Sequence, residues 1–177
     1  MKSTKKKNTL YTDRILSYVG TKKPLGILTS TPSRISRLIQ GLTDAQLRLP
    51  LTKGKWSIAQ IINHLCDGEV VLAYRSRKII AEPGTRIQAY DQDKWAANLH
   101  YDASDAKMQL ELFTAVRRGN VVLLRSLKPN EWKRFGIHEE RGKESIKRLA
   151  LLYAGHDINH LRQISSIRSS ILQSNRQ

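Results

Sequence analysis

The sequence predicts an all-α protein, and more specifically an antiparallel four-helix bundle. Four long segments place apolar side chains three and four residues apart, which is the helical period. No segment of useful length alternates apolar and polar residues as a half-buried strand would. The chain has 177 residues and is 40% hydrophobic, which suits one domain with one core. Four amphipathic helices without a sheet bury their apolar faces against one another.

The first bundle helix is expected in the segment TSTPSRISRLIQGLT. Thr31 is a candidate N-cap with Pro32 at the first helical position, and Gly41 ends the helix. An alternative start near Pro24 extends the apolar face through LGIL but places Pro32 inside the helix. The apolar stripe consists of Ile35, Leu38 and Ile39.

The second helix is expected over residues 57–82. Ser57 is a good N-cap, and Pro83 with Gly84 ends the helix. Its apolar positions are Ile58, Ile61, Ile62, Leu65, Leu72 and Ile79. The segment YDQDKW, residues 90–95, could hold one or two further helical turns.

The third helix is expected from Ser104 to about Leu127, where Lys128 and Pro129 break it. Its expected core face consists of Met108, Leu112, Ala115, Val116, Val122 and Leu123. The loop NEWKRFGIHEERGKE follows. The fourth helix is expected from residues 143–144 to about residue 172, and its inward stripe consists of Leu149, Leu152, His156, His160, Ile164 and Ile167.

Residues 1–20 are expected to form a basic, flexible extension, and residues 21–177 the helical-bundle domain. The segment MKSTKKKNTLYTD is not followed by the apolar stretch of a secretory signal. No apolar run approaches the roughly 18–20 residues that cross a bilayer, so we expect no membrane association. A single cysteine, Cys66, excludes an intramolecular disulfide and fits a reducing compartment. We therefore expect a cytoplasmic protein.

The formal net charge of +16 is large for this length. Such a charge attracts polyanions such as nucleic acids or acidic membrane surfaces. The sequence contains no RNA-binding signature with glycine and aromatic residues, no zinc finger and no clear helix-turn-helix. Two interpretations stay open: a solvated basic surface, and a nucleic-acid partner that binds this charge.

Three of the five histidines are expected to share one site. In AGHDINHLRQI, His156 and His160 lie one helical turn apart on the inward face. His64 lies between Ile61 and Leu65 on the second helix and should also face the core. Buried imidazoles need polar partners, and one divalent cation would serve all three. Three histidine ligands and an open position are typical of a reactive metal site, whereas ordinary packing of the histidine pair is the alternative.

Neighbouring side chains are candidates for supporting roles. Asp67, three residues after His64, and Asp157, beside His156, could accept hydrogen bonds that orient an imidazole. Gly68, one turn past His64, could keep space open beside the metal. Close helix–helix packing at this glycine is the alternative.

The other candidates lie farther from the three histidines. His138 could reach the bundle mouth as a proton donor or fourth ligand, and His100 is expected at the surface. Cys66 is expected to be a small buried residue rather than a ligand. Four arginines could hold carboxylates of an anionic substrate, with solvated or structural roles as the alternative; these are Arg75, Arg77, Arg141 and Arg162.

The segments WSIAQIINHLCDGE (56–69) and AGHDINHLRQI (154–164) resemble the two signature segments of the DinB/YfiT-like superfamily of bacterial metal-binding four-helix bundles. The resemblance covers residues 21–172 and is specific, because the first histidine, the long spacing and the HxxxH pair occur in this order. It implies an up-down-down-up bundle, commonly a homodimer, with a divalent metal ion, often nickel or zinc. The matching ligand positions are His64, His156 and His160.

The resemblance also implies a class of function. Some members are thiol-dependent S-transferases or isomerases that use low-molecular-weight thiols such as bacillithiol or mycothiol. We therefore expect a divalent-metal-dependent enzyme, a transferase or hydrolase, that acts on a small-molecule substrate. The sequence identifies no individual catalytic residue. The alternatives are a basic nucleic-acid-associated protein and a metal-binding interaction protein without catalysis.

Overall fold

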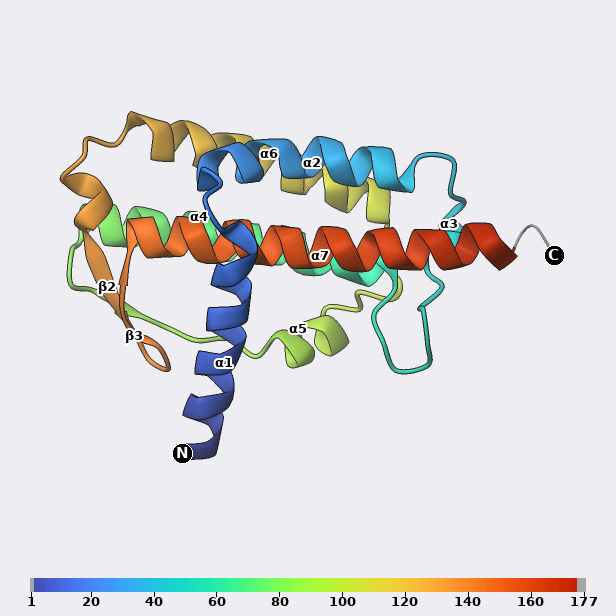
Figure 1. Cartoon of the computed structure of the whole chain (residues 1–177), viewed down its shortest axis with the longest axis horizontal. Helices are drawn as coiled ribbons and strands as arrows, with labels where there is room; N and C mark the ends of the chain where they lie inside the picture. The colour runs from blue at the N-terminus through green and yellow to red at the C-terminus, as the bar shows by residue number, and fades with distance from the viewer. Residues whose placement is uncertain (1, 175–177) are drawn as a thin grey trace.

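The structure, a computed structural model, describes residues 2–174, with side chains described from residue 10 onward. Four long helices form the bundle: α2 (Pro24–Ile39), α4 (Ile58–Ala81), α6 (Ala106–Ser126) and α7 (Ile146–Ser174). Helices α2 and α7 run in one direction and α4 and α6 in the other (Figure 1). The fold is therefore the expected four-helix bundle, with up-down-down-up order along the chain.

Helix α2 begins at Pro24, which is the earlier of the two expected starts. Proline at the first helical turn lacks an N–H group that would have no partner there. Pro32 lies inside the helix, and Thr31 does not cap it. The hydroxyl of Thr31 instead donates a hydrogen bond to the carbonyl of Ile27 at 2.9 Å.

Helices α4 and α6 begin with side-chain caps. The Ser57 hydroxyl accepts from the Gln60 backbone N–H, and the Gln60 side-chain oxygen accepts from the Ser57 N–H at 2.9 Å. This reciprocal capping box fixes the start of α4 about two helical turns before His64. At α6 the cap is Asp105, whose carboxylate accepts from the N–H groups of Lys107 and Met108.

The expected core face of α6 is wrong. Met108, Leu112 and Val122 are 56%, 48% and 62% exposed. The residues that α6 buries are Ala106, Leu110, Phe113, Arg117, Asn120, Val121 and Leu124. The apolar periodicity predicted that the outer face of α6 would be buried, because two polar residues, Arg117 and Asn120, lie in the middle of the face that packs against the core.

A small three-stranded sheet closes one end of the bundle. Its strands are β1 (Arg86–Ile87), β2 (Phe135–His138) and β3 (Gly142–Ser145), with β1 parallel and β3 antiparallel to β2. The remaining short elements are α3 (Asp44–Leu47), α5 (Gln92–Asn98) and the 3-10 turn η1 (Glu131–Lys133). The sequence prediction missed the sheet because strands of two to four residues are too short to show alternation. The expected start of α7 at residues 143–144 is wrong for the same reason. Strand β3 occupies these residues, and α7 (Ile146–Ser174) begins directly after it.

Helix α1 (Lys2–Val19) lies across α7 (Figure 1). Ile15 and Val19 are buried, and a Cβ added to Gly155 of α7 would overlap the backbone of Ile15. The guanidinium of Arg162 on α7 lies 4.3 Å from the centre of the Tyr18 ring. Residues 10–19 are therefore a packed helix and not the flexible extension expected there. The lysine-rich start of the segment obscured its apolar face.

None of the helices in the described part of the chain combines the length and the apolar content that crossing a bilayer requires.

Candidate metal centre

Three imidazoles from two helices converge inside the bundle. The Nε2 atom of His156 lies 2.9 Å from Nε2 of His64 and 3.0 Å from Nε2 of His160. One ligand nitrogen from each ring lies within 4.8 Å of the others. Imidazole nitrogens that share a tetrahedral cation at about 2.0–2.1 Å stand roughly 3.3 Å apart. The two separations measured from His156 are close to this value, so small shifts of the rings would let them share one ion.

The position of Gln163 determines which nitrogen of His160 is free. The side-chain oxygen of Gln163 lies 2.7 Å from Nδ1 of His160. An amide oxygen only accepts, so Nδ1 carries the proton and Nε2 presents a lone pair to the cluster. A partner of this kind is what metal-binding histidines usually have. The sequence prediction did not single out Gln163, although it lies three residues after His160 on the same helical face.

Burial keeps the three rings neutral. It lowers the pKa of His64 to about 3, with a further contribution from His160, and lowers the pKa of His160 to about 4. The pKa of His156 is lowered as well, first by burial and then by the neighbouring rings. All three rings are therefore neutral at pH 7, with one nitrogen of each able to offer a lone pair, which metal ligation requires.

Two cavities reach the histidines. One of about 490 Å³ is lined by His160 and Trp56, and one of about 500 Å³ is lined by His64, His156 and Gly68. The residues common to both linings are Tyr11, Gln92 and Asp93. Helix α1 and the start of α5 therefore contribute to both walls. Gly68 lines the second cavity together with His64 and His156, so the histidine cluster is reached from two cavities.

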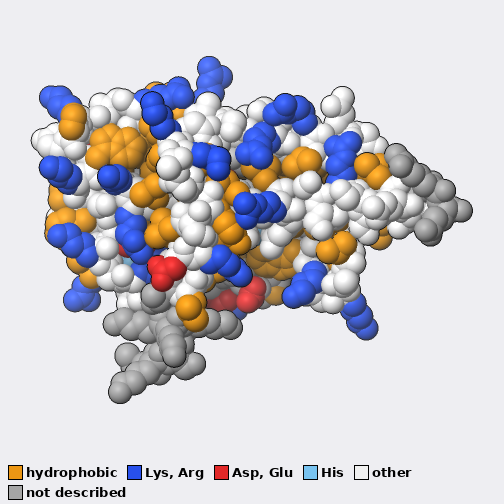
Figure 2. Space-filling model, in the orientation of Figure 1, with side chains coloured by type: hydrophobic (Ala, Val, Ile, Leu, Met, Phe, Trp, Pro, Cys, Tyr) orange, Lys and Arg blue, Asp and Glu red, His pale blue; other side chains and the backbone are white. Residues whose placement is uncertain are grey.

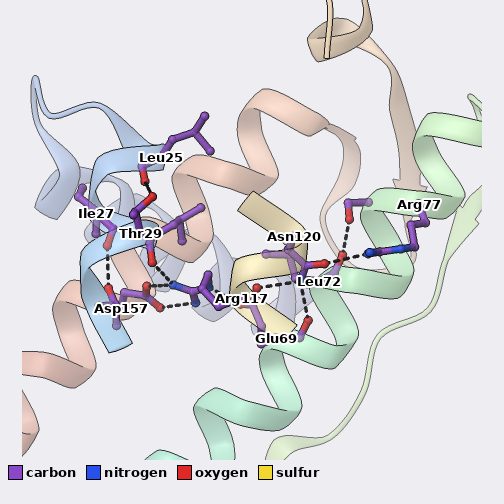
Figure 3. A network of polar contacts seen from close by, with 12 residues as sticks. Leu25, Ile27, Thr29, Glu69, Leu72, Arg77, Arg117, Asn120 and Asp157 are labelled. Atoms are coloured by element: carbon purple, nitrogen blue, oxygen red, sulfur yellow. Dashed lines mark hydrogen bonds and ion pairs between the residues drawn. The ribbon is translucent and has the colours of Figure 1, made fainter. Parts of the chain in front are cut away.

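A buried ion cluster joins the four bundle helices beside this site (Figure 3). Arg117 of α6 pairs with Asp157 of α7 at 2.5 and 3.1 Å and with Glu69 of α4 at 2.8 Å. It also donates to the carbonyl of Leu28 on α2 at 3.0 Å. Asn120 donates to Glu69 at 2.7 Å. Because Asp157 directly follows His156, the cluster helps to fix the position of α7 at the histidines.

The sequence profile of the DinB superfamily matches residues 27–164. The chain belongs to the DinB superfamily. It is 30% identical to a protein of Oceanobacillus iheyensis named "putative metal-dependent hydrolase", over 77% of this chain and 78% of the relative. YfiT of Bacillus subtilis carries the same description and is 25% identical over 82% of each chain. The YfiT structure, described as "a probable metal-dependent hydrolase with an unusual four-helix bundle topology", matches with a TM-score of 0.79 at 23% identity, over 84% of this chain and 86% of that one.

In this DinB-superfamily chain, both carboxylates expected to orient the imidazoles have other partners. Asp67 accepts a hydrogen bond from the Tyr101 hydroxyl at 2.5 Å. Asp157 pairs with Arg117. Their sequence positions beside His64 and His156 were therefore a misleading signal, because each carboxylate turns toward a partner that is distant in sequence.

The other candidate ligands lie outside the cluster. His138 is buried in β2, lines neither cavity, and has its pKa lowered to about 4 by burial and by Arg141. His138 is therefore not placed to act as a fourth ligand or as a proton donor at the mouth of the bundle. His100 is exposed, as expected. Cys66 is fully buried, and burial raises the pKa of its thiol to about 12, so it is the inert small residue that was expected.

Of the four candidate arginines, Arg141 lines a cavity beside His64 and His156. Its guanidinium forms two hydrogen bonds with Glu144, at 2.7 and 2.9 Å, and these hold it in place. The other three contact neighbouring groups of the fold: Arg75 the carbonyl of Gln88, Arg77 the side chain of Asn120, and Arg162 the ring of Tyr18.

Proposed function

We propose that this protein is a metal-dependent enzyme in which His64, His156 and His160 hold one divalent cation, nickel or zinc. The convergence of three neutral imidazoles at a point reached by two cavities carries this proposal. Three histidine ligands leave at least one coordination position for a reactant. The relatives named as metal-dependent hydrolases support the same class.

A divalent cation in this position supplies a Lewis acid that lowers the pKa of a water or thiol nucleophile. The residues of the chain prepare the site. Gln163 orients His160, and burial keeps the imidazoles in the neutral form. Arg141, held by Glu144 in the cavity wall, can attract an anionic group of a small-molecule substrate.

The identity of the nucleophile decides between two reactions. Water would give hydrolysis, and a low-molecular-weight thiol would give S-transfer to an electrophile. Two cavities of similar volume reach the histidine cluster, one lined by His160 and the other by His64 and His156, and each lies within the roughly 300–1,000 Å³ that small-molecule sites occupy. This arrangement offers room for two reactants, so we favour S-transfer and keep hydrolysis as the alternative.

The metal site is tested by elemental analysis of the purified protein. Wild-type protein should carry about one divalent ion per chain. The His64→Ala and His156→Ala variants should each lose most of that metal and keep their helical circular dichroism. His100→Ala changes an exposed histidine outside the cluster and should keep the metal. Full metal content in both cluster variants would reject the shared site.

The reaction is tested by assaying metal-loaded protein with bacillithiol or mycothiol and a reactive alkyl halide, and separately with ester and amide substrates without thiol. We expect thioether formation that requires both the thiol and the metal. Metal-dependent cleavage of the esters or amides without thiol would establish hydrolysis instead. No metal-dependent turnover in either assay would count against an enzyme.

The basic surface favours a second and separate function, which is binding to nucleic acid. Helix α2 contains no carboxylate, and the one acidic residue of α7, Asp157, is buried. Figure 2 shows lysine and arginine side chains spread over the face that these helices form. Affinity for duplex DNA should fall steeply with salt. Replacing Arg34 and Arg37 by serine should reduce the slope of log affinity against log salt concentration by about one for each phosphate that is no longer neutralised. An unchanged slope would contradict binding through α2.

A further inference from the structure

Two tyrosines line the cavity of about 500 Å³ beside the histidines. Tyr153 lies on α7 three residues before His156, and the centres of these two rings are 6.3 Å apart. Tyr90 follows strand β1, and its hydroxyl lies 3.9 Å from the position that a Cβ on Gly68 would occupy. The two phenols therefore extend the cavity wall from the histidines toward the end of the bundle that the sheet closes.

The hydroxyls of these two tyrosines are donors without an acceptor. Among the residues that the structure describes, neither Tyr90 nor Tyr153 forms a side-chain hydrogen bond, whereas the hydroxyl of Tyr101 donates to Asp67. Burial raises the pKa of both Tyr90 and Tyr153, so both phenols keep their protons at neutral pH. Polar groups withdrawn from bulk water are usually paired. Two adjacent unused donors therefore favour a ligand that brings an acceptor oxygen.

An unbalanced positive charge lies behind the two phenols. Arg75 of α4 is 5% exposed, and its guanidinium carbon lies 5.7 Å from the centre of the Tyr90 ring. In the described part of the chain it donates to one backbone carbonyl and forms no ion pair. Arg141, in the cavity wall, is neutralised by Glu144. Both arginines lower the pKa of Tyr90 and Tyr153 against the effect of burial, so both lie near these side chains. A buried charge without a counter-charge is costly, and an anion bound at the phenols would supply one.

We propose that this cavity binds a small carboxylate with an apolar body. The carboxylate accepts hydrogen bonds from Tyr90 and Tyr153 and is attracted by the charge of Arg75. Ile15 and Leu152, which are buried and line the same cavity, contact the apolar body. The volume of the cavity suits a small-molecule ligand. The proposal rests on the proposed function for the reaction that follows at the histidines, but the binding itself needs no metal ion.

Three carboxylates also line this cavity, and they lie at its exposed side. Asp91, Asp93 and Glu140 are exposed, so water and salt screen their charges. Asp91 in addition pairs with Lys94 at 3.7 Å. The charge of the buried Arg75 is screened much less. A carboxylate ligand is therefore directed to the phenols and away from the exposed side.

The ligand class is tested by isothermal titration calorimetry of the metal-free, full-length protein. The probes are benzoate and benzamide, its neutral analogue of similar shape. Benzoate should bind at least about tenfold more tightly, because its charge strengthens the hydrogen bonds that it accepts. Equal affinities, or no binding of benzoate at about 10 mM, would overturn the proposal. Should the purified protein hold no divalent ion, the metal centre fails, whereas this titration still decides the carboxylate site.

The two hydroxyls are tested by Tyr90→Phe and Tyr153→Phe, which keep the rings and remove one donor each. Each substitution should weaken benzoate binding about tenfold. Tyr74→Phe is the matched control, because Tyr74 is 64% exposed on α4 and lines neither cavity. It should leave the affinity within about twofold of wild type. Unchanged affinity in both cavity variants would overturn the role of the phenols.

The charge is tested at Arg75 by two substitutions of similar size. Arg75→Gln removes the charge and should weaken benzoate binding about tenfold, whereas Arg75→Lys keeps the charge and should recover most of that loss. Circular dichroism and thermal melting check that each variant is folded. Equal affinities of the folded glutamine and lysine variants would overturn the role of this charge.

Discussion

Gln163 decides how well His160 can serve as a ligand. Its amide oxygen accepts the Nδ1 proton at 2.7 Å and so leaves the Nε2 lone pair for a cation. Without an acceptor at that position, the ring is free to place its proton on either nitrogen and to rotate. One polar side chain outside the three histidines therefore controls both the tautomer and the orientation of a candidate ligand.

Gln163→Leu should accordingly lower the affinity for zinc or nickel by about 10–100-fold. Gln163→Glu retains an acceptor and should recover most of that loss. Ser166→Ala is the control, because Ser166 lines the same cavity on the same helix. Competition with a chromophoric chelator gives the affinity. If the leucine and alanine variants bind equally well, Gln163 does not orient the ligand.

Burial of the three imidazoles also sets the pH dependence of the metal-free protein. The folded-state pKa values of His64 and His160, about 3 and about 4, lie below the ordinary 6.5. As the pH falls below 6.5, the unfolded chain gains protons that the folded chain does not take up. The free energy of unfolding should therefore decrease by up to roughly 1.4 kcal/mol per pH unit for each such histidine.

This decrease can be measured by urea denaturation of the chelated protein between pH 7.5 and 4.5. The matched variant is His64→Gln/His160→Gln, which removes two of the titrating groups and should show a shallower slope. A saturating divalent metal should instead keep the wild-type protein more stable at the upper end of this range. Identical slopes for the metal-free wild type and the variant would mean that the imidazoles are accessible to protons in the folded state.

At the scale of elements, local signals in the sequence predicted α4 and the inward direction of the three histidines correctly. Ser57 and the Pro83–Gly84 pair mark the ends of that helix within one or two residues. The helical period also predicted correctly that His64 points inward, where it meets the histidine pair on α7. Resemblance to a family added the expectation that the histidines share one ion. These predictions depend on spacing within a single segment, which sequence displays directly.

The predictions that failed depend on contacts between distant segments. Arg117 lies on the buried face of α6 because Glu69 and Asp157, 48 and 40 residues away, neutralise it there. The expected flexible extension contains α1 because Ile15 packs against Gly155. Gln163 acquires its role only when His160 is already directed at two other rings. No periodicity within one segment reveals such partners.

Helix α1 should therefore matter for stability, contrary to the expectation that residues 1–20 form a flexible extension. A Cβ at position 155 would overlap the backbone of Ile15 and push α1 away from α7. Gly155→Ala should thus destabilise the protein by about 1–3 kcal/mol. Gly26→Ala is the matched control on α2, where an added Cβ meets nothing within 4 Å.

The control should stabilise the protein by about 0.5–1 kcal/mol, because alanine favours the helix more than glycine does. Thermal melting of the two variants beside wild type distinguishes them by the sign of the change. Equal stabilisation by both substitutions would show that α1 does not press against α7 at this point. Deletion of residues 1–19 should lower the melting temperature in the same direction as Gly155→Ala.

At the scale of the whole molecule, one side chain contacts all four bundle helices. Arg117 belongs to α6, pairs with Glu69 on α4 and Asp157 on α7, and donates to a carbonyl of α2. Buried charges of this kind add little net stability when complete, but breaking one is costly. Their value here is that the helix carrying His64 and the helix carrying His156 are held in one relative position by a common partner.

Arg117→Leu should destabilise the fold by roughly 3–5 kcal/mol at pH 8, because it leaves two buried carboxylates without a counter-charge. Arg125→Leu removes an exposed arginine from the same helix and should cost about 0.5 kcal/mol or less. In the Arg117 variant the buried carboxyl groups should have pKa values above those of the unfolded chain, so the folded state takes up protons first as the pH falls. The difference in unfolding free energy from wild type, measured by urea denaturation, should therefore shrink between pH 8 and pH 5. A difference that stays constant over this range would mean that poorer packing, and not unpaired charge, causes the destabilisation.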